Sequence, residues 1–156
     1  MKLLLAHFLK SVPEGTTLPK PLPPHMTIVP PVDHTHSPAW VIDLHGSLRG
    51  VLGSSAPPIH LKSRTISLLG PDNNIPALLI DDSGSYLSYI RYRLADIVGF
   101  SFDQARAQGY SLPFHVTLVN DRPCSVNRYM RHISLLVKHP GSDRYVVEKN
   151  FKLGSG

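Results

Sequence analysis

The chain has 156 residues, a hydrophobic fraction of 42% and a formal net charge of +5. This composition excludes an intrinsically disordered chain, and the length suits one domain with its own core. The charge gives a mild bias towards anionic partners, without a polybasic tail. No apolar run approaches the roughly 18 residues that a membrane-spanning helix needs, so a membrane partner is not expected.

We expect a single bilobal domain over residues 1–153, followed by a flexible tail at 154–156. The apolar start, Lys2–Ala6, resembles a signal peptide, but the run ends by Lys10 without a small-residue cleavage pattern. We interpret it as a buried first strand. Cys124 is the only cysteine, which excludes an intrachain disulfide and is compatible with a reducing cytoplasm. The sequence therefore predicts a cytoplasmic protein, and we expect a monomer.

Apolar alternation and turn residues predict a chain of class α+β. The predicted strands cover residues 2–9, 26–29, 59–69, 76–81, 133–137 and 145–153, with one more beginning near residue 115. Helical patterns separate the second strand from the third, and the fourth from the strand near residue 115. This order indicates two pseudo-equivalent lobes, and no linker is long enough to make them independent domains.

Two helices are predicted. The first begins at Ser37-Pro38, a typical helix start, and ends near residue 48 or 51, although Gly46 and Gly50 weaken it. The second ends at Gly99 and carries an apolar stripe made of Leu87, Ile90, Leu94, Ile97 and Val98. Other side chains of this helix are expected on its outer surface: Tyr86, Tyr89, Arg91, Tyr92 and Arg93.

One eight-residue stretch occurs twice, at 22–29 and at 112–119. The copies read Leu-Pro-Pro-His-Met-Thr-Ile-Val and Leu-Pro-Phe-His-Val-Thr-Leu-Val, and five of the eight positions are identical. Either copy alone is a short match that arises by chance, as the polar side of a half-buried strand. The repetition, with the same Leu-Pro lead-in and the same apolar alternation, is the informative feature.

Both copies are predicted strands, in which successive side chains point to opposite faces. His25 and Thr27 therefore share one face, and His115 and Thr117 share a face of the second strand. The preceding prolines are tolerated at the first residues of a strand, so each imidazole is expected near a strand start. We interpret the two polar pairs as one site shared between two similar halves.

Two imidazoles in one site suit acid–base catalysis near neutral pH. One, as a base, takes a proton from the attacking group, and the other, as an acid, protonates the leaving group. Threonine hydroxyls two residues along can donate hydrogen bonds to oxygens on which charge builds. His25 and His115 are the predicted acid–base pair, with Thr27 and Thr117 beside them. The sequence does not assign the acid and the base.

Two His-apolar-Thr-apolar motifs on strands, far apart in a small α+β chain, resemble the signature of the two-histidine (2H) phosphoesterases. This group includes the 2′-5′ RNA ligase-like proteins and the cyclic nucleotide phosphodiesterases. The resemblance extends to the chain length, the apolar first strand and the helix before the second motif. It implies two pseudo-symmetric lobes of antiparallel sheet, helices packed outside and a central cleft in which the motifs face each other. It also implies activity on 2′,3′-cyclic phosphate or 2′-5′ phosphodiester bonds, without a metal or other cofactor.

Other polar residues are weaker candidates. Tyr110, Arg131 and His132 are possible substrate contacts, and His132 also begins a His-apolar-Ser-apolar match that lacks the Leu-Pro lead-in. Metal ligands are a further possibility at 33–36, where Asp33, His34 and His36 are close in sequence. Because no fourth ligand or cysteine cluster accompanies these three, a solvated loop is favoured and no metal site is predicted.

Three functions remain open at this point. The first is a metal-independent phosphodiesterase that acts on RNA ends or small nucleotides. The second uses the same chemistry to join RNA ends through a 2′-5′ bond, or to cleave a cyclic or 2′-5′-linked signalling oligonucleotide. The third is a nucleotide- or RNA-binding module without catalysis, which the presence of both histidines and both threonines disfavours.

Overall fold

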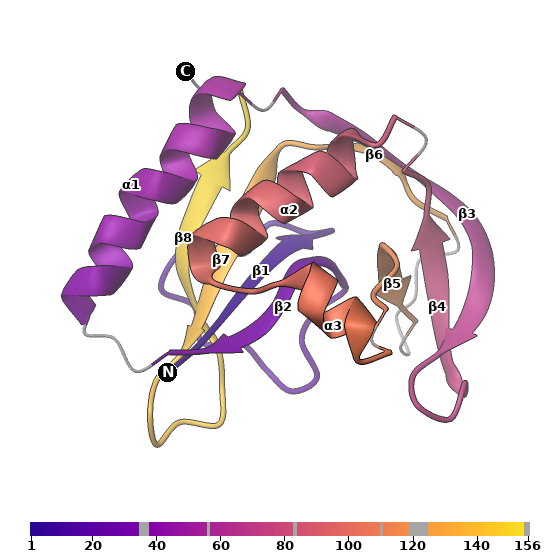
Figure 1. The fold of residues 1–156 in the computed structure, drawn as a ribbon, viewed down its shortest axis with the longest axis horizontal. Helices are drawn as coiled ribbons and strands as arrows, with labels where there is room; N and C mark the ends of the chain where they lie inside the picture. Colours follow the sequence, from indigo (N-terminus) through magenta and orange to yellow (C-terminus); the bar gives the residue numbers. More distant parts are fainter. Residues whose placement is uncertain (35–37, 56, 83, 110, 119–124, 155–156) are drawn as a thin grey trace.

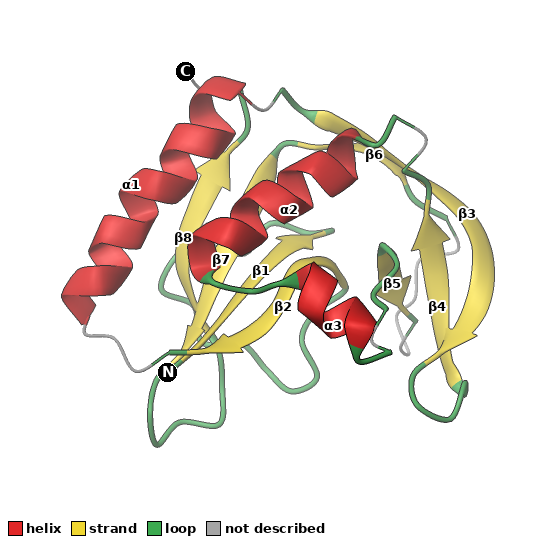
Figure 2. Ribbon diagram, viewed as in Figure 1, coloured by secondary structure: helices red, strands yellow, loops and turns green. Residues whose placement is uncertain are grey.

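The computed structural model describes residues 1–34, 38–55, 57–82, 84–109, 111–118 and 125–154 (Figures 1 and 2). Its elements, in chain order, are β1 (Lys2–Phe8), β2 (His25–Asp33), α1 (Pro38–Ser55), β3 (Ile59–Leu69), β4 (Ile75–Ile80), α2 (Tyr86–Val98), α3 (Phe102–Ala107), β5 (His115–Thr117), β6 (Asn127–Met130), β7 (His132–Lys138) and β8 (Val146–Lys152). This content confirms the predicted α+β class.

The strands form one curled sheet in the order β6-β3-β4-β5-β2-β1-β7-β8, and neighbouring strands pair antiparallel. The two motif strands, β2 and β5, are neighbours at the centre of this order. Each lobe takes strands from distant parts of the chain, because β7 and β8 join β1 and β2 while β6 joins β3. The lobes are therefore halves of one sheet that meet at the β2–β5 seam.

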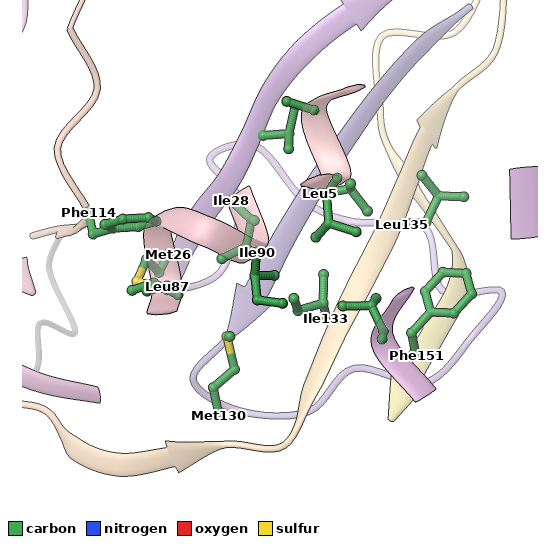
Figure 3. Packing of buried hydrophobic residues seen from close by; sticks show 14 of the residues in the cluster. Leu5, Met26, Ile28, Leu87, Ile90, Phe114, Met130, Ile133, Leu135 and Phe151 are labelled. Carbon is green, nitrogen blue, oxygen red and sulfur yellow. The ribbon is translucent and has the colours of Figure 1, made fainter. Parts of the chain in front are cut away.

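The helices cover one face of this sheet, as Figure 1 shows for α1 and α2. The main core lies between them and the strands, and strand residues such as Met26, Ile28 and Leu135 pack there around Ile90 of α2 (Figure 3). On the opposite face, a smaller cluster around Phe8 is covered by the loop that carries Leu18. We call this opposite side the helix-free face, because no described residue of the three helices belongs to its cluster.

The helix predicted from its apolar stripe is confirmed as α2. Leu87, Ile90, Leu94 and Val98 are buried, and Gly99 ends the helix with a φ of 83°, a left-handed conformation that glycine adopts without strain. Helix α1 runs on to Ser55, past the predicted end, because burial of its apolar side chains outweighs the weak helix propensity of its glycines.

Two elements were missed from the sequence. Helix α3 begins after Ser101, whose side chain accepts a hydrogen bond from the backbone N–H of Gln104 at 3.1 Å. That Ser-x-x-Gln spacing is a recognised start signal, present in the sequence but not used. Strand β6 is short, and its sequence shows no alternation of apolar and polar residues. It is a strand because it forms backbone hydrogen bonds with β3.

Candidate active site

The sheet brings the two histidine motifs side by side. Met26 of β2 pairs with Val116 of β5, and both side chains are buried in the helix-side core. In an antiparallel pair the residues on either side also lie opposite each other, so His25 lies opposite Thr117 and Thr27 opposite His115. Since successive side chains alternate, all four project from the helix-free face. The predicted site residues therefore meet in one place.

The arrangement has an approximate two-fold symmetry centred on the Met26–Val116 pair. His25 and His115 are diagonal neighbours across the seam, a relation that separates backbone positions by about 7–8 Å. On the outer sides, β1 pairs Phe8 with His25 and β4 pairs Leu79 with His115, so neither motif is at a sheet edge.

Each imidazole is held by the same hydrogen bond. Nδ1 of His25 lies 2.8 Å from the carbonyl oxygen of Pro23, and Nδ1 of His115 lies 2.7 Å from that of Pro113. A carbonyl only accepts, so each Nδ1 carries the proton and donates it. Nε2 is then the nitrogen left for a substrate on both rings. The repeated Leu-Pro lead-in thus has a physical role, because its proline supplies the carbonyl that orients the ring.

Burial lowers the pKa of His25 below its usual value of 6.5, and the nearby His115 lowers it further, while the hydrogen bond to Pro23 opposes both. The ring of Phe8, 5.9 Å from that of His25 between centroids, contributes to this burial. A lowered pKa favours the neutral imidazole at neutral pH, and neutral imidazole is the form that accepts a proton. His25 is therefore suited to act as a base.

Arg91 of α2 corrects one expectation, because it does not lie on the outer surface of its helix. Its side chain is buried, with 5% of its surface exposed, and it reaches through the core to the backbone of both motifs. Nε donates to the carbonyl of Ile28 at 2.8 Å and Nη2 donates to that of Thr27 at 3.0 Å. Nη1 donates to the carbonyl of Leu112 at 2.6 Å, immediately before Pro113.

The same guanidinium stacks on the residue that precedes the second histidine. Cζ of Arg91 lies 3.6 Å from the centroid of the Phe114 ring and 5.1 Å from that of Phe102. Phe114 is buried in the helix-side core, so it lies on the other side of the sheet from His115. One cation thus ties together the two strands that carry the histidines. The sequence did not reveal this role, since an arginine in an amphipathic helix is usually exposed.

A pocket of about 560 Å³ opens beside His115 and Thr117. Its other walls come from the turn between β3 and β4 and from the segment before β5: Leu69, Gly70, Asn73, Ile75, Gly109, Ser111, Leu112 and Pro113. Apolar walls with a few polar groups are typical of pockets for small organic ligands. The pocket therefore extends the four-residue site towards the lobe that contains β5.

Of the three weaker candidates, Arg131 and His132 do not line this pocket. Tyr110 lies outside the described residues. Arg131 is exposed next to β6, with Cζ 5.5 Å from the centroid of the Tyr129 ring. His132 begins β7 and packs against His7 of β1, with 4.8 Å between ring centroids. Burial lowers the pKa of His132, and the charge of Arg128 lowers it further.

The loop considered for a metal is only partly described, because His36 lies outside the described residues. His34 is used structurally, with Nε2 2.8 Å from the carbonyl oxygen of Val98 and its ring 4.6 Å from that of Trp40. Among the residues that the structure describes, no three histidine, cysteine or carboxylate side chains gather as a metal site. Within the same ranges, no helix is long and apolar enough to cross a membrane.

Known structures share this fold at low sequence identity. TT0787 of Thermus thermophilus matches at 15% identity over 100% of both chains, with a TM-score of 0.63. A phosphoesterase matches at 16% identity over 98% of both chains, with a TM-score of 0.62. LigT of Escherichia coli, solved with 3′-AMP, matches at 15% identity over 98% of both chains, with a TM-score of 0.60. No protein-family model and no curated protein sequence matches the chain. The likeness confirms the predicted fold.

Proposed function

We propose that this chain is a 2H phosphoesterase, a hydrolase that opens 2′,3′-cyclic phosphates or cleaves 2′-5′ phosphodiester bonds of RNA ends or small nucleotides. The observation that carries the proposal is the pair of imidazoles on neighbouring strands, each held through Nδ1 by a proline carbonyl. Each presents Nε2 on the same face of the sheet, opposite a threonine hydroxyl of the other motif.

In the proposed reaction, neutral His25 takes a proton from water through Nε2 as the water oxygen attacks phosphorus. The bond from phosphorus to one ribose oxygen breaks, and that oxygen receives a proton from Nε2 of protonated His115. One water is consumed, and a phosphomonoester and a free hydroxyl are formed. Thr27 and Thr117 donate hydrogen bonds to the non-bridging oxygens as their charge grows. Proton exchange with solvent then restores His25 and His115 to their starting forms.

The assignment of base and acid follows from the surroundings of the two rings. His25 is the base because burial lowers its pKa and keeps it neutral. His115 is then the acid, next to the pocket of about 560 Å³ that we assign to the nucleoside. The shared fold with LigT, which was solved with 3′-AMP, supports a nucleotide ligand. The two histidines supply both proton transfers and the two threonines stabilise the phosphate oxygens, so the proposed reaction needs no metal or cofactor.

The test is ³¹P NMR of a 2′,3′-cyclic mononucleotide incubated with the purified protein and EDTA. We expect conversion to one monoester isomer, and a loss of rate of about 10²–10⁴-fold in His25→Ala and in His115→Ala. His139→Ala, an exposed histidine in the turn after β7, is the matched control and should keep full activity. Turnover that survives either motif substitution would overturn the mechanism. An inert wild-type protein that still binds nucleotides would favour a binding module.

A further inference from the structure

A row of exposed cationic and aromatic side chains lies beyond the site, on β3 and β6. Ile59 and Leu61 of β3 are buried in the helix-side core, so His60 and Lys62 project from the helix-free face. Tyr129 of β6 pairs with His60, and the two rings lie 5.2 Å apart between centroids. The face that carries the four motif residues therefore continues to the edge of the sheet.

The strand register connects this region to the site. His115 pairs with Leu79 of β4, and Ser63 of β3 pairs with Ile80. The register shifts by one residue between Ser63 and Ile66, so Arg64 and Thr65 together lie opposite Leu79. Adjacent strands are about 4.8 Å apart, so Arg64 is about 10 Å from His115 across the sheet. Tyr129 of β6 pairs with His60, four residues along β3 from Arg64, so it lies about 14 Å across the sheet and about 13 Å along it from His115, roughly 20 Å in all. A polymer leaving the site across β4 would meet these residues next.

Positive charge dominates this region. Lys62, Arg64 and Arg131 are exposed, and in the part of the chain that the structure describes none of the three forms an ion pair. Asp81 follows β4, and its backbone N–H bonds to the carbonyl of Lys62 at 2.8 Å. Asp81 and Asp82 line one pocket with His60, so two carboxylates partly offset the three cations. Exposed, unpaired cations attract an anionic chain through long-range electrostatics. Because they stay in contact with water, they pay only a small desolvation penalty.

An aromatic side chain lies among these cations without being required for the core. Tyr129 is 53% exposed, and the guanidinium of Arg131 lies 5.5 Å from its ring centroid. A ring flanked by cations on an open sheet is suited to stack a base while the cations contact phosphates. An acidic peptide would match the charges but would not use the exposed ring in this way.

We propose that His60, Lys62, Arg64, Tyr129 and Arg131, together the β3–β6 strip, bind the nucleotides of single-stranded RNA that precede the reactive phosphate. The preferred substrate is then an oligoribonucleotide with a 2′,3′-cyclic phosphate end, and a mononucleotide uses only the four-residue site and its pocket. This inference rests on the proposed function for the identity of the reacting end.

The length of the strip sets a size for the substrate. A stacked strand rises about 3.4 Å per nucleotide, so the span of roughly 20 Å from His115 to Tyr129 matches about six stacked nucleotides. We therefore expect kcat/KM to rise from a cyclic mononucleotide to an oligomer of about six nucleotides, and to change little from there to an octamer.

The kinetic test compares a cyclic-phosphate mononucleotide with a cyclic-phosphate octamer in wild type and in the double variant Lys62→Ala/Arg64→Ala. We expect the variant to lose about tenfold or more in kcat/KM on the octamer and to keep the wild-type value on the mononucleotide. Arg49→Ala removes an exposed cation on α1 and is the matched control. The proposed role of the strip would be wrong if the double variant lowered kcat/KM equally on both substrates. It would also be wrong if wild type did not prefer the octamer.

A binding test is independent of catalysis. Fluorescence anisotropy measures the affinity for a labelled octaribonucleotide that ends in a 3′-phosphate. The slope of the logarithm of the binding constant against the logarithm of the salt concentration should be about 1.4 smaller in magnitude in the double variant, the value for two lost contacts to a single strand. Tyr129→Ala should weaken binding about tenfold and Tyr129→Phe should restore it, because stacking needs only the ring. Tyr89→Ala, at an exposed tyrosine of α2, controls for loss of a surface ring.

The two tests separate the two proposals. Binding that depends on the strip together with absent turnover would reject the phosphoesterase and keep the RNA surface. If the protein turns over the mononucleotide, but neither Lys62→Ala/Arg64→Ala nor Tyr129→Ala changes octamer binding, the phosphoesterase is kept and the RNA surface is rejected. Displacement of the octamer by an acidic peptide of equal charge at equal concentration would reject RNA as the occupant of the strip.

Discussion

At the residue scale, the two histidines resemble each other in their orientation but differ in their surroundings. The carbonyls of Pro23 and Pro113 fix the same tautomer on both rings, which leaves Nε2 as the nitrogen available to a ligand in each case. Burial then lowers the pKa of His25. Local packing thus favours the neutral form of His25, which is the form that an acid–base mechanism requires of its base.

The first prediction concerns the pH profile of kcat/KM. We expect a bell shape, in which the rate falls on the acid side as the base His25 becomes protonated and on the alkaline side as the acid loses its proton. Because burial lowers the pKa of His25, the midpoint of the acid side should lie below about 6.5. Steady-state rates from about pH 4.5 to 9 measure it, and a profile flat across that range would remove the acid–base pair from the mechanism.

At the scale of the elements, α2 does more than cover the sheet. Arg91 donates to carbonyls of β2 and of the segment that leads into β5, so the helix holds the two motif strands in register through one side chain. Strand β5 has only three residues and needs such support, because three residues provide few ladder hydrogen bonds of their own. The distance between the two imidazoles therefore depends on α2.

The second prediction tests this link. Arg91→Met removes the donors and leaves three buried carbonyls without their partner, so we expect a loss of about 3 kcal/mol in the free energy of unfolding. In the remaining folded protein we expect kcat to fall more than KM rises, because the histidines lose their spacing. Urea unfolding and steady-state kinetics measure the two effects.

Its control is on the same helix. Arg93 is exposed and donates to the hydroxyl of Tyr89, so Arg93→Met should change stability by less than about 0.5 kcal/mol. Arg91→Lys keeps the charge but loses the fork of donors and should rescue only part of the activity. If Arg91→Met behaved like Arg93→Met, the proposed role of Arg91 would be wrong.

At the scale of the whole molecule, a buried histidine of β1 couples stability to pH. His7 is fully buried in β1, and Nδ1 lies 2.8 Å from the carbonyl oxygen of His132. Burial lowers its pKa from 6.5 to about 4, and the charges of His132 and Arg128 add to that effect. The native state therefore keeps His7 neutral over a range in which the unfolded chain is protonated.

The third prediction follows from this difference. The unfolded state binds a proton at His7 below pH 6.5 and the folded state only near pH 4, so stability is lost as the pH falls between these values. The lowered pKa corresponds to a loss of up to about 3 kcal/mol from His7. Urea unfolding from pH 7.5 to 4 in wild type and in His7→Leu measures it, and the variant should show a shallower decline. If stability declined identically in wild type and in His7→Leu, His7 would be excluded as a source of the pH dependence.

The sequence determined the features that depend on local periodicity. The stripe from Leu87 to Val98 predicted α2, because a helical period of apolar residues has few other ways to be buried. The repeated His-x-Thr predicted that each pair shares one face of a strand, since alternation in a strand is fixed by backbone geometry. Helix α3 and β6 are short, and only a weak signal or a partner strand defines them.

The tertiary structure decided what the two motifs do together. Pairing of Met26 with Val116 places each histidine opposite the other motif's threonine, and this register depends on hydrogen bonds between strands far apart in the chain. The burial of Arg91 has the same origin, because its acceptors belong to β2 and to the segment before β5. The periodicity of apolar residues predicts which face of a strand or a helix is buried. Only long-range packing determines which faces meet.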